Sequence, residues 1–286
     1  MNIALFATLN RPRALQIVRE TSEWLRAHQH TVLLAPELAP AIGCAACVPS
    51  TVEWMAEAQL AISIGGDGTM LSAVRAAAPF NVPVLGVNAG ALGFLTEVTP
   101  EQLPELLPRV LAGEYTVEPR MLLRGSLQRG ATEIATMTAL NDIVVRQGAQ
   151  GRLIKLDVRV AGHHLGTFSA DGIIVSTPTG STAYGLSAGG PIVHPAAQVL
   201  LLIPICPHSL SFRPLVAPAT DPLEIYCEGN QQGDEMLIIP DGQEPISAQH
   251  GDRLICAPAP EHALLVKLGL GSFYDRLRDK LQWGGH

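Results

Sequence analysis

Short apolar runs alternate with segments of helical periodicity in the N-terminal part of the chain. Runs of aliphatic residues bounded by turn formers predict buried strands at residues 3–7, 31–35, 60–64 and 84–87. We expect a helix after Pro12, where apolar residues recur at helical spacing, and further helices at 70–78 and 99–111. Thr99 and Gln102 have the spacing of a capping box for the last of these helices. The alternation predicts a Rossmann-like parallel sheet covered by helices.

The pattern changes near Tyr115, where short β-type runs separated by Gly, Pro, Asn and Asp replace the alternation. The clearest runs are residues 121–127, 154–160, 173–176, 223–226, 236–239, 254–257 and 263–268. Proline is frequent among them, which suits strand edges and turns. We therefore predict an α/β domain at 1–116 and a β-rich, β-sandwich-like domain at 117–268. A helix-like tail at 269–286 is expected to pack back on the first domain.

Length and composition provide ample apolar residues for a core, since the 286 residues are 47% hydrophobic and only 16% charged. A formal net charge of -7 argues against a protein that coats nucleic acid, because such binding depends on basic side chains. The longest apolar run, residues 199–206, is far shorter than the roughly 20 residues of a membrane-spanning helix. The N-terminus also lacks the basic start of a signal peptide. We expect a soluble cytoplasmic protein with no membrane or nucleic-acid partner.

The cysteines and histidines give little indication of a metal site. Cys44 and Cys47 form one CxxC pair, but no second pair exists to complete a zinc ribbon. His163 and His164 are adjacent on a predicted strand, so their side chains point to opposite faces and cannot chelate one ion. We therefore expect no metal held by the protein alone.

The sharpest local signal is the GGDGT loop, which lies between a predicted strand and a predicted helix and consists of Gly65, Gly66, Asp67, Gly68 and Thr69. Glycines let a phosphate approach the backbone, and the N-terminus of the following helix favours an anion. Asp67 is unusual there, because its charge repels a phosphate. It either binds a metal that accompanies the phosphate or accepts a proton from an attacking hydroxyl. The alternative is a tight turn in which Asp67 caps the helix; Thr69 could also serve as the N-cap.

A second signal follows Asp171, where a predicted strand enters a turn crowded with hydroxyls and glycines at residues 176–187. Thr182, Tyr184 and Ser187 offer donors, acceptors and an aromatic edge, which suit a nucleoside. The alternative is a capped turn that begins a short helix. The usual nucleotide signatures are missing, since the sequence contains neither a GxxxxGK[ST] P-loop nor a GxGxxG dinucleotide fingerprint.

The two signals together resemble the NAD kinase family, and the resemblance covers nearly the whole chain. Other motifs follow in the family's order: NAG at 88–90, LGFLT at 92–96, ND at 141–142, DG at 171–172, STPTGSTAY at 176–184, PHSLS with RP at 207–214, and DGQ at 241–243. GGDGT alone also occurs in lipid kinases and phosphofructokinases, whereas its combination with TPTGSTAY is highly specific.

The resemblance implies roles for individual residues. Asp67 would accept the proton of the NAD 2′-hydroxyl, and Asp171 would face the nicotinamide end. The residues implied to contact NAD or ATP are Gly65, Gly66, Gly68, Thr69, Asn88, Asn141, Asp142, Arg152, Asp171, Thr182, Ala183, Tyr184, Gly185, Leu186, Ser187 and Gln243. Asp142 replaces a glutamate common in the family and has a shorter reach. The resemblance also implies a homodimer or homotetramer with its site between the domains.

The implied activity is Mg²⁺-dependent transfer of the ATP γ-phosphoryl group to the 2′-hydroxyl of the adenosine ribose of NAD, which gives NADP. Inorganic polyphosphate stays open as an alternative donor. Two other functions also stay open: a GGDGT-type kinase with a lipid or sugar acceptor, and a non-catalytic NAD-binding sensor. The sequence has no basic or apolar patch typical of a membrane-facing lipid kinase, and the intact Asp67 argues against the sensor.

Overall fold

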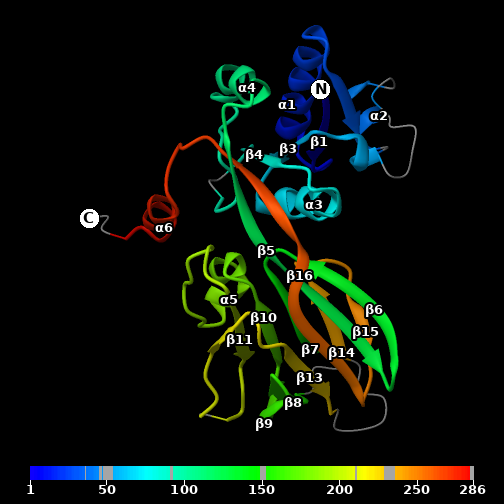
Figure 1. Cartoon of the computed structure of the whole chain (residues 1–286), viewed down its shortest axis with the longest axis vertical. Helices are drawn as coiled ribbons and strands as arrows, with labels where there is room; N and C mark the ends of the chain where they lie inside the picture. Colours follow the sequence, from blue (N-terminus) through cyan, green and yellow to red (C-terminus); the bar gives the residue numbers. More distant parts are fainter. Residues whose placement is uncertain are drawn as a thin grey trace. The chain divides into compact units, whose positions relative to one another are not determined.

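The computed structural model describes residues 1–35, 37–44, 47, 54–90, 93–148, 153–209, 211–228 and 236–283. The chain divides into two compact units (Figure 1). Unit 1 combines residues 1–119 with 261–286, and unit 2 is the continuous segment 120–260. Two long strands, β5 (Thr116–Arg129) and β16 (Asp252–Lys267), each contribute residues to both units. The domain boundaries expected from the sequence stay a prediction.

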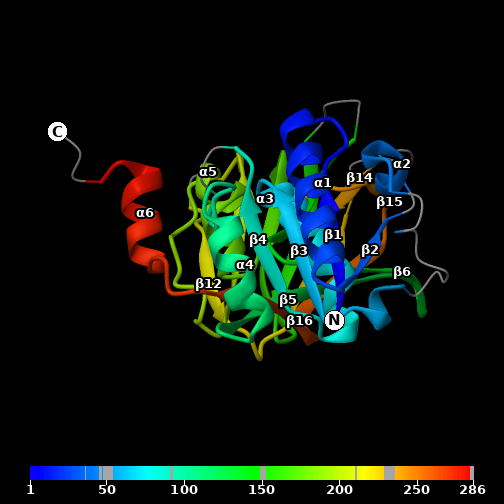
Figure 2. The same ribbon diagram turned by 90° about the horizontal axis from the view of Figure 1, so that it is seen from above.

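Unit 1 contains a parallel sheet in the order β2-β1-β3-β4 (Figure 2). Its strands are β1 (Asn2–Ala7), β2 (Thr31–Leu34), β3 (Leu60–Gly65) and β4 (Val84–Asn88). The end of β16 joins this sheet beside β4, where Leu265 pairs in parallel with Val84. Every residue of β3 and β4 is buried, as expected for parallel strands covered on both faces. The predicted Rossmann-like parallel sheet is confirmed.

The helices of unit 1 each come after one of its strands along the chain. They are α1 (Pro12–Ala27), α2 (Leu38–Ile42), α3 (Asp67–Ala77), α4 (Leu103–Leu111) and α6 (Phe273–Leu281), with the 3₁₀ helices η2 (Trp54–Glu57) and η3 (Ala78–Phe80). On α1, buried Ala14, Val18 and Leu25 recur at helical spacing and join the core beneath the sheet. Cys44 and Cys47 form a disulfide, a pairing that their CxxC spacing did not predict. No helix within the described ranges is long and apolar enough to cross a bilayer.

Two helix starts differ from the sequence predictions. The α3 helix begins at Asp67, with Gly66 as its N-cap in an extended conformation, so Thr69 lies inside the first turn and is not the cap. The α4 helix begins at Leu103, and Thr99 lies in a preceding turn. The Gln102 side chain does accept a hydrogen bond from the Thr99 backbone N–H at 3.0 Å. The expected capping residue pair therefore stabilises a turn before the helix, because Pro104 sets the first helical turn.

Unit 2 is built from two antiparallel sheets. The first has the order β12-β11-β10-β7-β14-β15; the second contains β16, β13, β8 and β9, with β5 and β6 paired alongside. The bounds of these strands are β6 (Thr132–Ala139), β7 (Asp142–Gln147), β8 (Ile154–Val160), β9 (His163–Ala170), β10 (Gly172–Ser176), β11 (Val199–Ile205), β12 (Leu215–Pro218), β13 (Leu223–Cys227), β14 (Met236–Pro240) and β15 (Ile246–Ala248). The runs predicted at 254–257 and 263–268 lie on the single long strand β16, except for Leu268, which follows its last residue.

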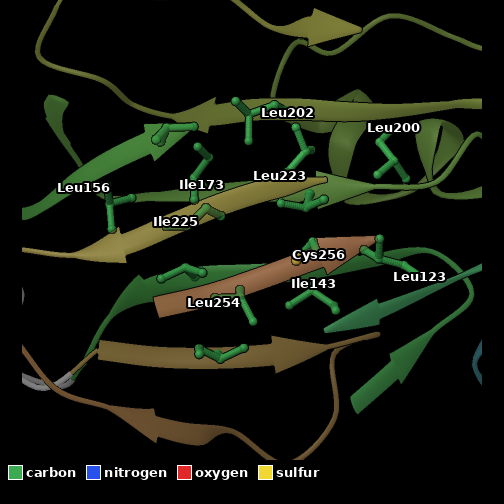
Figure 3. Packing of buried hydrophobic residues seen from close by; sticks show 14 of the residues in the cluster. Leu123, Ile143, Leu156, Ile173, Leu200, Leu202, Leu223, Ile225, Leu254 and Cys256 are labelled. Atoms are coloured by element: carbon green, nitrogen blue, oxygen red, sulfur yellow. The ribbon is translucent and has the colours of Figure 1, made fainter. Parts of the chain in front are cut away.

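One apolar cluster receives side chains from both sheets of unit 2 (Figure 3). Ile143 and Ile173 come from the first sheet, and Leu156, Ile225 and Leu254 come from the second. Each is at most 2% exposed, as expected where the inner faces of a sandwich meet. The predicted β-rich, sandwich-like domain is confirmed.

The C-terminal tail returns to unit 1, as predicted. The α6 helix has a capping box, in which Ser272 and Asp275 exchange side chain to backbone hydrogen bonds. Arg276 on α6 forms a buried ion pair with Glu97, which lies 179 positions earlier in the chain.

Candidate functional site

The GGDGT loop lies at the carboxyl end of β3, next to the loop that follows β4. Gly65 pairs with Asn88 in the sheet, and the Gly65 carbonyl accepts a hydrogen bond from the Ala89 backbone N–H at 3.0 Å. The buried Asn88 side chain accepts the Gly90 N–H at 3.0 Å, which shapes the second loop. The carboxyl edge of a parallel sheet is where open α/β folds bind ligands. The sequence-predicted residues of unit 1 are therefore brought together at this edge.

The Asp67 carboxylate is held in a fixed orientation by a later part of the loop that follows β4. Its Oδ2 accepts a hydrogen bond from the Phe94 backbone N–H at 3.0 Å, and its Oδ1 accepts the Leu95 N–H at 3.2 Å. A Cβ at Gly93 would lie 2.0 Å from Oδ1, so this approach requires glycine there. Asp67 is the first residue of α3 and makes no capping hydrogen bond, so the interpretation of Asp67 as a helix cap is wrong. The half-buried carboxylate is oriented in the first turn of a helix, where its charge is favourable.

The glycines of the GGDGT loop differ in what the packing demands of them. A Cβ at Gly65 would lie 2.2 Å from Oγ1 and 2.8 Å from Cβ of Thr69, so the turn itself requires glycine at this position. The Thr69 hydroxyl is in turn 2.9 Å from the hydroxyl of Thr8. A Cβ at Gly66 or Gly68 meets no atom within 4 Å, and neither residue has a positive φ. Packing therefore accounts for Gly65, but it does not account for Gly66 or Gly68.

In unit 2, Asp241 organises the Asn141–Asp142 pair. Its carboxylate accepts backbone N–H bonds from Leu140 at 2.8 Å, Asn141 at 2.8 Å and Asp142 at 3.2 Å. The Asp142 carbonyl accepts the Asp241 N–H at 2.9 Å in return. Asp241 belongs to the DGQ motif at 241–243, and its positive φ of 48° marks the tight turn that places it.

The Asp142 carboxyl is 5% exposed at the start of β7. Burial, together with the nearby negative charge of Asp241, raises the pKa of Asp142 to about 7. A group with such a pKa changes its charge near neutral pH. Any hydrogen bond that Asp142 makes to a ligand therefore depends on pH.

Most hydroxyls of the 176–187 turn bond within the turn and its neighbours. Thr177 Oγ1 donates to the Leu140 carbonyl at 2.6 Å and accepts the Gly180 N–H at 3.2 Å. Ser181 Oγ donates to the Pro178 carbonyl at 2.7 Å and accepts the Val193 N–H at 3.0 Å. Both side chains are buried. The interpretation of this segment as a stabilised turn before a short helix therefore holds for its first half, which forms the 3₁₀ helix η4 (Thr179–Thr182).

The second half of the turn, α5 (Tyr184–Ser187), contributes Tyr184 to the lining of an open pocket, whereas the predicted Leu186 and Ser187 are not among its lining residues. Tyr184 is 46% exposed and lines this cavity of about 420 Å³ together with Asp171. The other lining residues are Arg146, Gln147, Gly148, Ile205 and Leu237. Gly185 itself is buried, and a Cβ there would lie 2.9 Å from the Ile203 side chain. The structure thus brings Asp171 and Tyr184 to one pocket, whereas it assigns Gly185 to packing.

The pocket contains Arg146 and Gln147, which the sequence analysis missed. Both end β7, the strand that starts at the predicted Asp142, and β7 pairs with β10 so that Arg146 lies opposite Gly172. The antiparallel register therefore places Gln147 opposite the predicted Asp171, and the Gln147 N–H donates to the Asp171 carbonyl at 3.2 Å. A prediction that β7 pairs with β10 would have identified Arg146 as a residue of this pocket.

The remaining predictions have separate outcomes. Gln243 is exposed in the turn after β14, with its N–H on the Pro240 carbonyl at 2.9 Å, and it is not among the residues that line the pocket. Arg152 lies outside the described residues. In the part of the chain that the structure describes, no group of three or more His, Cys, Asp or Glu side chains could hold a metal ion.

The sequence matches two family descriptions that together cover most of the chain. Residues 3–115 match the ATP-NAD kinase N-terminal domain, and residues 140–268 match the ATP-NAD kinase C-terminal domain. The NAD kinase of Geotalea daltonii is 42% identical over 282 residues, which are 99% of this chain and 98% of that protein. The NAD kinase of Moorella thermoacetica is also 42% identical, over 99% of this chain and 90% of its own length.

Solved structures agree with these matches. Yeast NADH kinase complexed with NADH has a TM-score of 0.89 and 26% identity, over 100% of this chain and 89% of that one. An NAD kinase from Archaeoglobus fulgidus in complex with ATP has a TM-score of 0.74 and 25% identity, over 99% and 98% of the two chains. The resemblance noted in the sequence is confirmed, and the chain belongs to the NAD kinase family.

Proposed function

We propose that this chain transfers the γ-phosphoryl group of ATP, bound with Mg²⁺, to the 2′-hydroxyl of the adenosine ribose of NAD. In this reaction a bond forms between the 2′-oxygen and the γ-phosphorus, and the bond from that phosphorus to the β,γ-bridging oxygen breaks. The hydroxyl proton passes to the chain, and ADP leaves. The observation that carries the proposal is the oriented carboxylate of Asp67, set between two glycines that the packing does not require.

Asp67 is the proposed general base. Two backbone N–H groups hold its oxygens at 3.0 and 3.2 Å, and each carboxylate oxygen keeps a second lone pair free to accept a hydroxyl proton. Because the side chain is already oriented, little freedom is lost when the acceptor hydroxyl arrives. General-base catalysis of this kind supplies roughly 10²- to 10⁴-fold in rate.

The GGDGT loop is the proposed cradle for the ATP phosphates. Gly66 and Gly68 leave the backbone accessible, and the N-terminus of α3 offers unpaired N–H groups to an anion. Phosphoryl transfer needs mainly positioning and charge stabilisation, which these groups supply together with the Mg²⁺ that accompanies ATP. We treat this Mg²⁺ as part of the substrate.

Unit 2 holds the proposed NAD contacts. Asn141 and Asp142, fixed by Asp241, would bind ribose hydroxyls and the adenosine. The pocket that contains Tyr184 and Asp171 would take the nucleoside and the nicotinamide end. The predicted homodimer or homotetramer stays a prediction, as does the use of polyphosphate.

The test is the substitution Asp67→Asn, which keeps the size of the side chain and one of its hydrogen-bond acceptors. We expect kcat to fall roughly 10²- to 10⁴-fold, because the amide cannot take the proton. Near-normal turnover would show that Asp67 is not the general base. The matched control is Glu105→Gln on the exposed face of α4, which makes the same chemical change away from the loop and should leave kcat unchanged.

Product analysis separates the proposed activity from its alternatives. The protein is incubated with ATP, Mg²⁺ and, in separate reactions, NAD, NADH, a diacylglycerol and a sugar. Formation of NADP from NAD supports the proposal. Formation of a phospholipid or a sugar phosphate would instead identify a lipid kinase or a sugar kinase. Tight binding of NAD with no product would identify a sensor.

A further inference from the structure

A buried carboxylate, Glu97, ties the C-terminal helix α6 to the loop that orients Asp67. The Glu97 side chain is 1% exposed, and its Oε2 accepts hydrogen bonds from Lys267 Nζ at 3.0 Å and from Arg276 Nη2. Its Oε1 accepts the backbone N–H groups of Leu268 at 3.2 Å and Leu270 at 3.3 Å. Burial alone would raise the pKa of Glu97, but Lys267 and Arg276 outweigh it, and the pKa is lowered. Glu97 is therefore a buried anion held by two cations.

Arg276 makes one more contact, which leads towards Asp67. Its Nη1 donates a hydrogen bond to the Phe94 carbonyl oxygen at 3.0 Å. That carbonyl belongs to the peptide group that joins Phe94 to Leu95, and the N–H of the same peptide group donates to Asp67 Oδ1 at 3.2 Å. In a planar trans peptide the carbonyl and the N–H point in opposite directions. One peptide group therefore lies between the guanidinium and the carboxylate.

We infer that Arg276 is a positioning residue for Asp67, acting through the peptide between Phe94 and Leu95. The inference rests on the proposed function, since it assigns the orientation of the proposed base to a side chain of the C-terminal helix. Two of the guanidinium's N–H groups are used, one on Glu97 and one on the Phe94 carbonyl. With the guanidinium fixed by Glu97, the peptide plane is fixed, and so is the direction of the N–H that Asp67 accepts.

The physical effect has two parts. A charged donor on the carbonyl polarises the peptide and strengthens the hydrogen bond made by its N–H. The same contact also keeps the loop at 93–97 from rotating, and Gly93, which packs against Asp67, gives this loop little rigidity of its own. A shift of about 1 Å in a catalytic group can cost on the order of 100-fold in rate.

Lys267 offers a matched control, because it neutralises Glu97 without touching this loop peptide. Its ion pairs are to Glu97 at 3.0 Å and Glu118 at 3.8 Å. Lys267→Met and Arg276→Met each remove one of the two cations beside the same buried carboxylate. A purely structural role predicts that the two variants behave alike in both stability and turnover.

The experiment measures kcat, both KM values and Tm for Arg276→Met and Lys267→Met. We expect both variants to lose stability, and only Arg276→Met to lose kcat, by on the order of 10- to 100-fold, with KM for ATP and NAD changed less than about threefold. Arg276→Lys keeps the charge but not the two-pronged donor, so we expect near-normal Tm and a kcat reduced about fivefold or more. If Arg276→Met does not fold, Arg276→Lys decides the outcome alone.

Combining Arg276→Met or Arg276→Lys with Asp67→Asn distinguishes the inference from the proposed function. Once Asp67 is replaced, loss of Arg276 should reduce kcat little further, because both changes act on the same group. Equal kcat values for Arg276→Met and Lys267→Met, or a normal kcat for Arg276→Lys, would overturn the positioning role while leaving Asp67 as the base. Normal turnover of Asp67→Asn would instead overturn the proposed base itself.

Discussion

The GGDGT loop of unit 1 and the 176–187 turn of unit 2 are similar in composition but differ in why their residues are there. In the turn, Gly180 and Gly185 are enclosed by protein atoms, and the hydroxyls of Thr177 and Ser181 bond to nearby backbone. In the loop, Gly66 and Gly68 meet nothing within 4 Å. The comparison teaches that the space around each Cα distinguishes glycines that the packing requires, such as Gly65, Gly180 and Gly185, from glycines that it does not require.

The side chains that carry charge differ in the same way. Asp67 in unit 1 is half-buried, with its two oxygens on the backbone of a neighbouring loop. Asp142 in unit 2 is almost fully buried and lies near a second carboxylate, Asp241. The first arrangement orients a half-buried carboxylate, whereas the second disfavours the charge of Asp142. Three substitutions break or sharpen this comparison.

The largest effect on stability is expected from Gly180→Ala. The new Cβ would lie 2.2 Å from the Asn141 carbonyl oxygen and 2.6 Å from its carbonyl carbon, so backbone has to move. We expect a loss of about 3 kcal/mol, and at about 2–4 °C per kcal/mol a Tm lower by about 6–12 °C in thermal unfolding. Gly185→Ala is the graded control, because its Cβ meets the flexible end of Ile203 at 2.9 Å, and it should cost less. Equal Tm values for Gly180→Ala and wild type would contradict the packing role.

Gly68→Ala should show the opposite behaviour. The position lies in the first turn of α3 without a positive φ, so alanine is tolerated and adds up to about 1 kcal/mol of helix stability. The same methyl group would stand where the phosphates approach, and we expect kcat/KM for ATP to fall about tenfold, which is about 1.4 kcal/mol. Steady-state kinetics and a melting curve on one preparation check both halves. An unchanged kcat/KM would mean that the loop does not need this glycine for its ligand.

Asp142→Asn tests whether the buried carboxyl costs stability. Burial and the Asp241 charge raise the pKa of Asp142 from 3.8 to about 7, so the folded state holds a proton that the unfolded chain has lost. The contribution of this group to stability is therefore fully present below about pH 4 and is lost as the pH rises through about 7. At pH 8 we expect the free energy of unfolding of the variant to exceed that of wild type by on the order of 1–2 kcal/mol, because the amide removes the buried charge. The buried N–H donors of the amide keep the gain this small.

The measurement for Asp142→Asn is thermal unfolding of both proteins from pH 4 to pH 8. The difference in Tm should be small at pH 4 and should grow towards pH 8. A constant difference across this range would show that folding does not raise the pKa of Asp142 above its value in the unfolded chain. The KM for NAD is then measured at pH 8. A higher KM in the variant would indicate that Asp142 contacts NAD, and an unchanged KM would indicate a purely structural residue.

The sequence predicted those elements whose signal is local. The aliphatic runs that became β1 to β4 identified the parallel sheet, and the run at 154–160 matches β8 residue for residue. The helix predicted from Met70 begins three residues earlier, at Asp67; the glycines at 66 and 68 suggest a loop, although only Gly66 is extended. The earlier start places Asp67 in the first turn of α3 and makes Gly66, not Asp67, the N-cap.

The contacts that orient the site could not be predicted, because they join residues far apart in the chain. Asp241 reaches the Asn141 N–H across 100 positions, and Arg276 reaches the Phe94 carbonyl across 182. Nothing in a helix with alternating Arg and Lys indicates that the Arg276 side chain is 11% exposed while the Arg278 side chain is 60% exposed. Tertiary packing determines this difference in exposure, which cannot be inferred from the periodicity of the sequence.

Because the chain is synthesised from its N-terminus, the two units become complete at different times. Unit 2 is one continuous segment, so it can fold while later residues are still on the ribosome. Unit 1 has to wait for residues 261–283, since β16 completes its sheet and α6 brings the guanidinium to the loop beside Asp67. The orientation of Asp67 in unit 1 would thus be completed only when α6, near the end of the sequence, has been made and has folded.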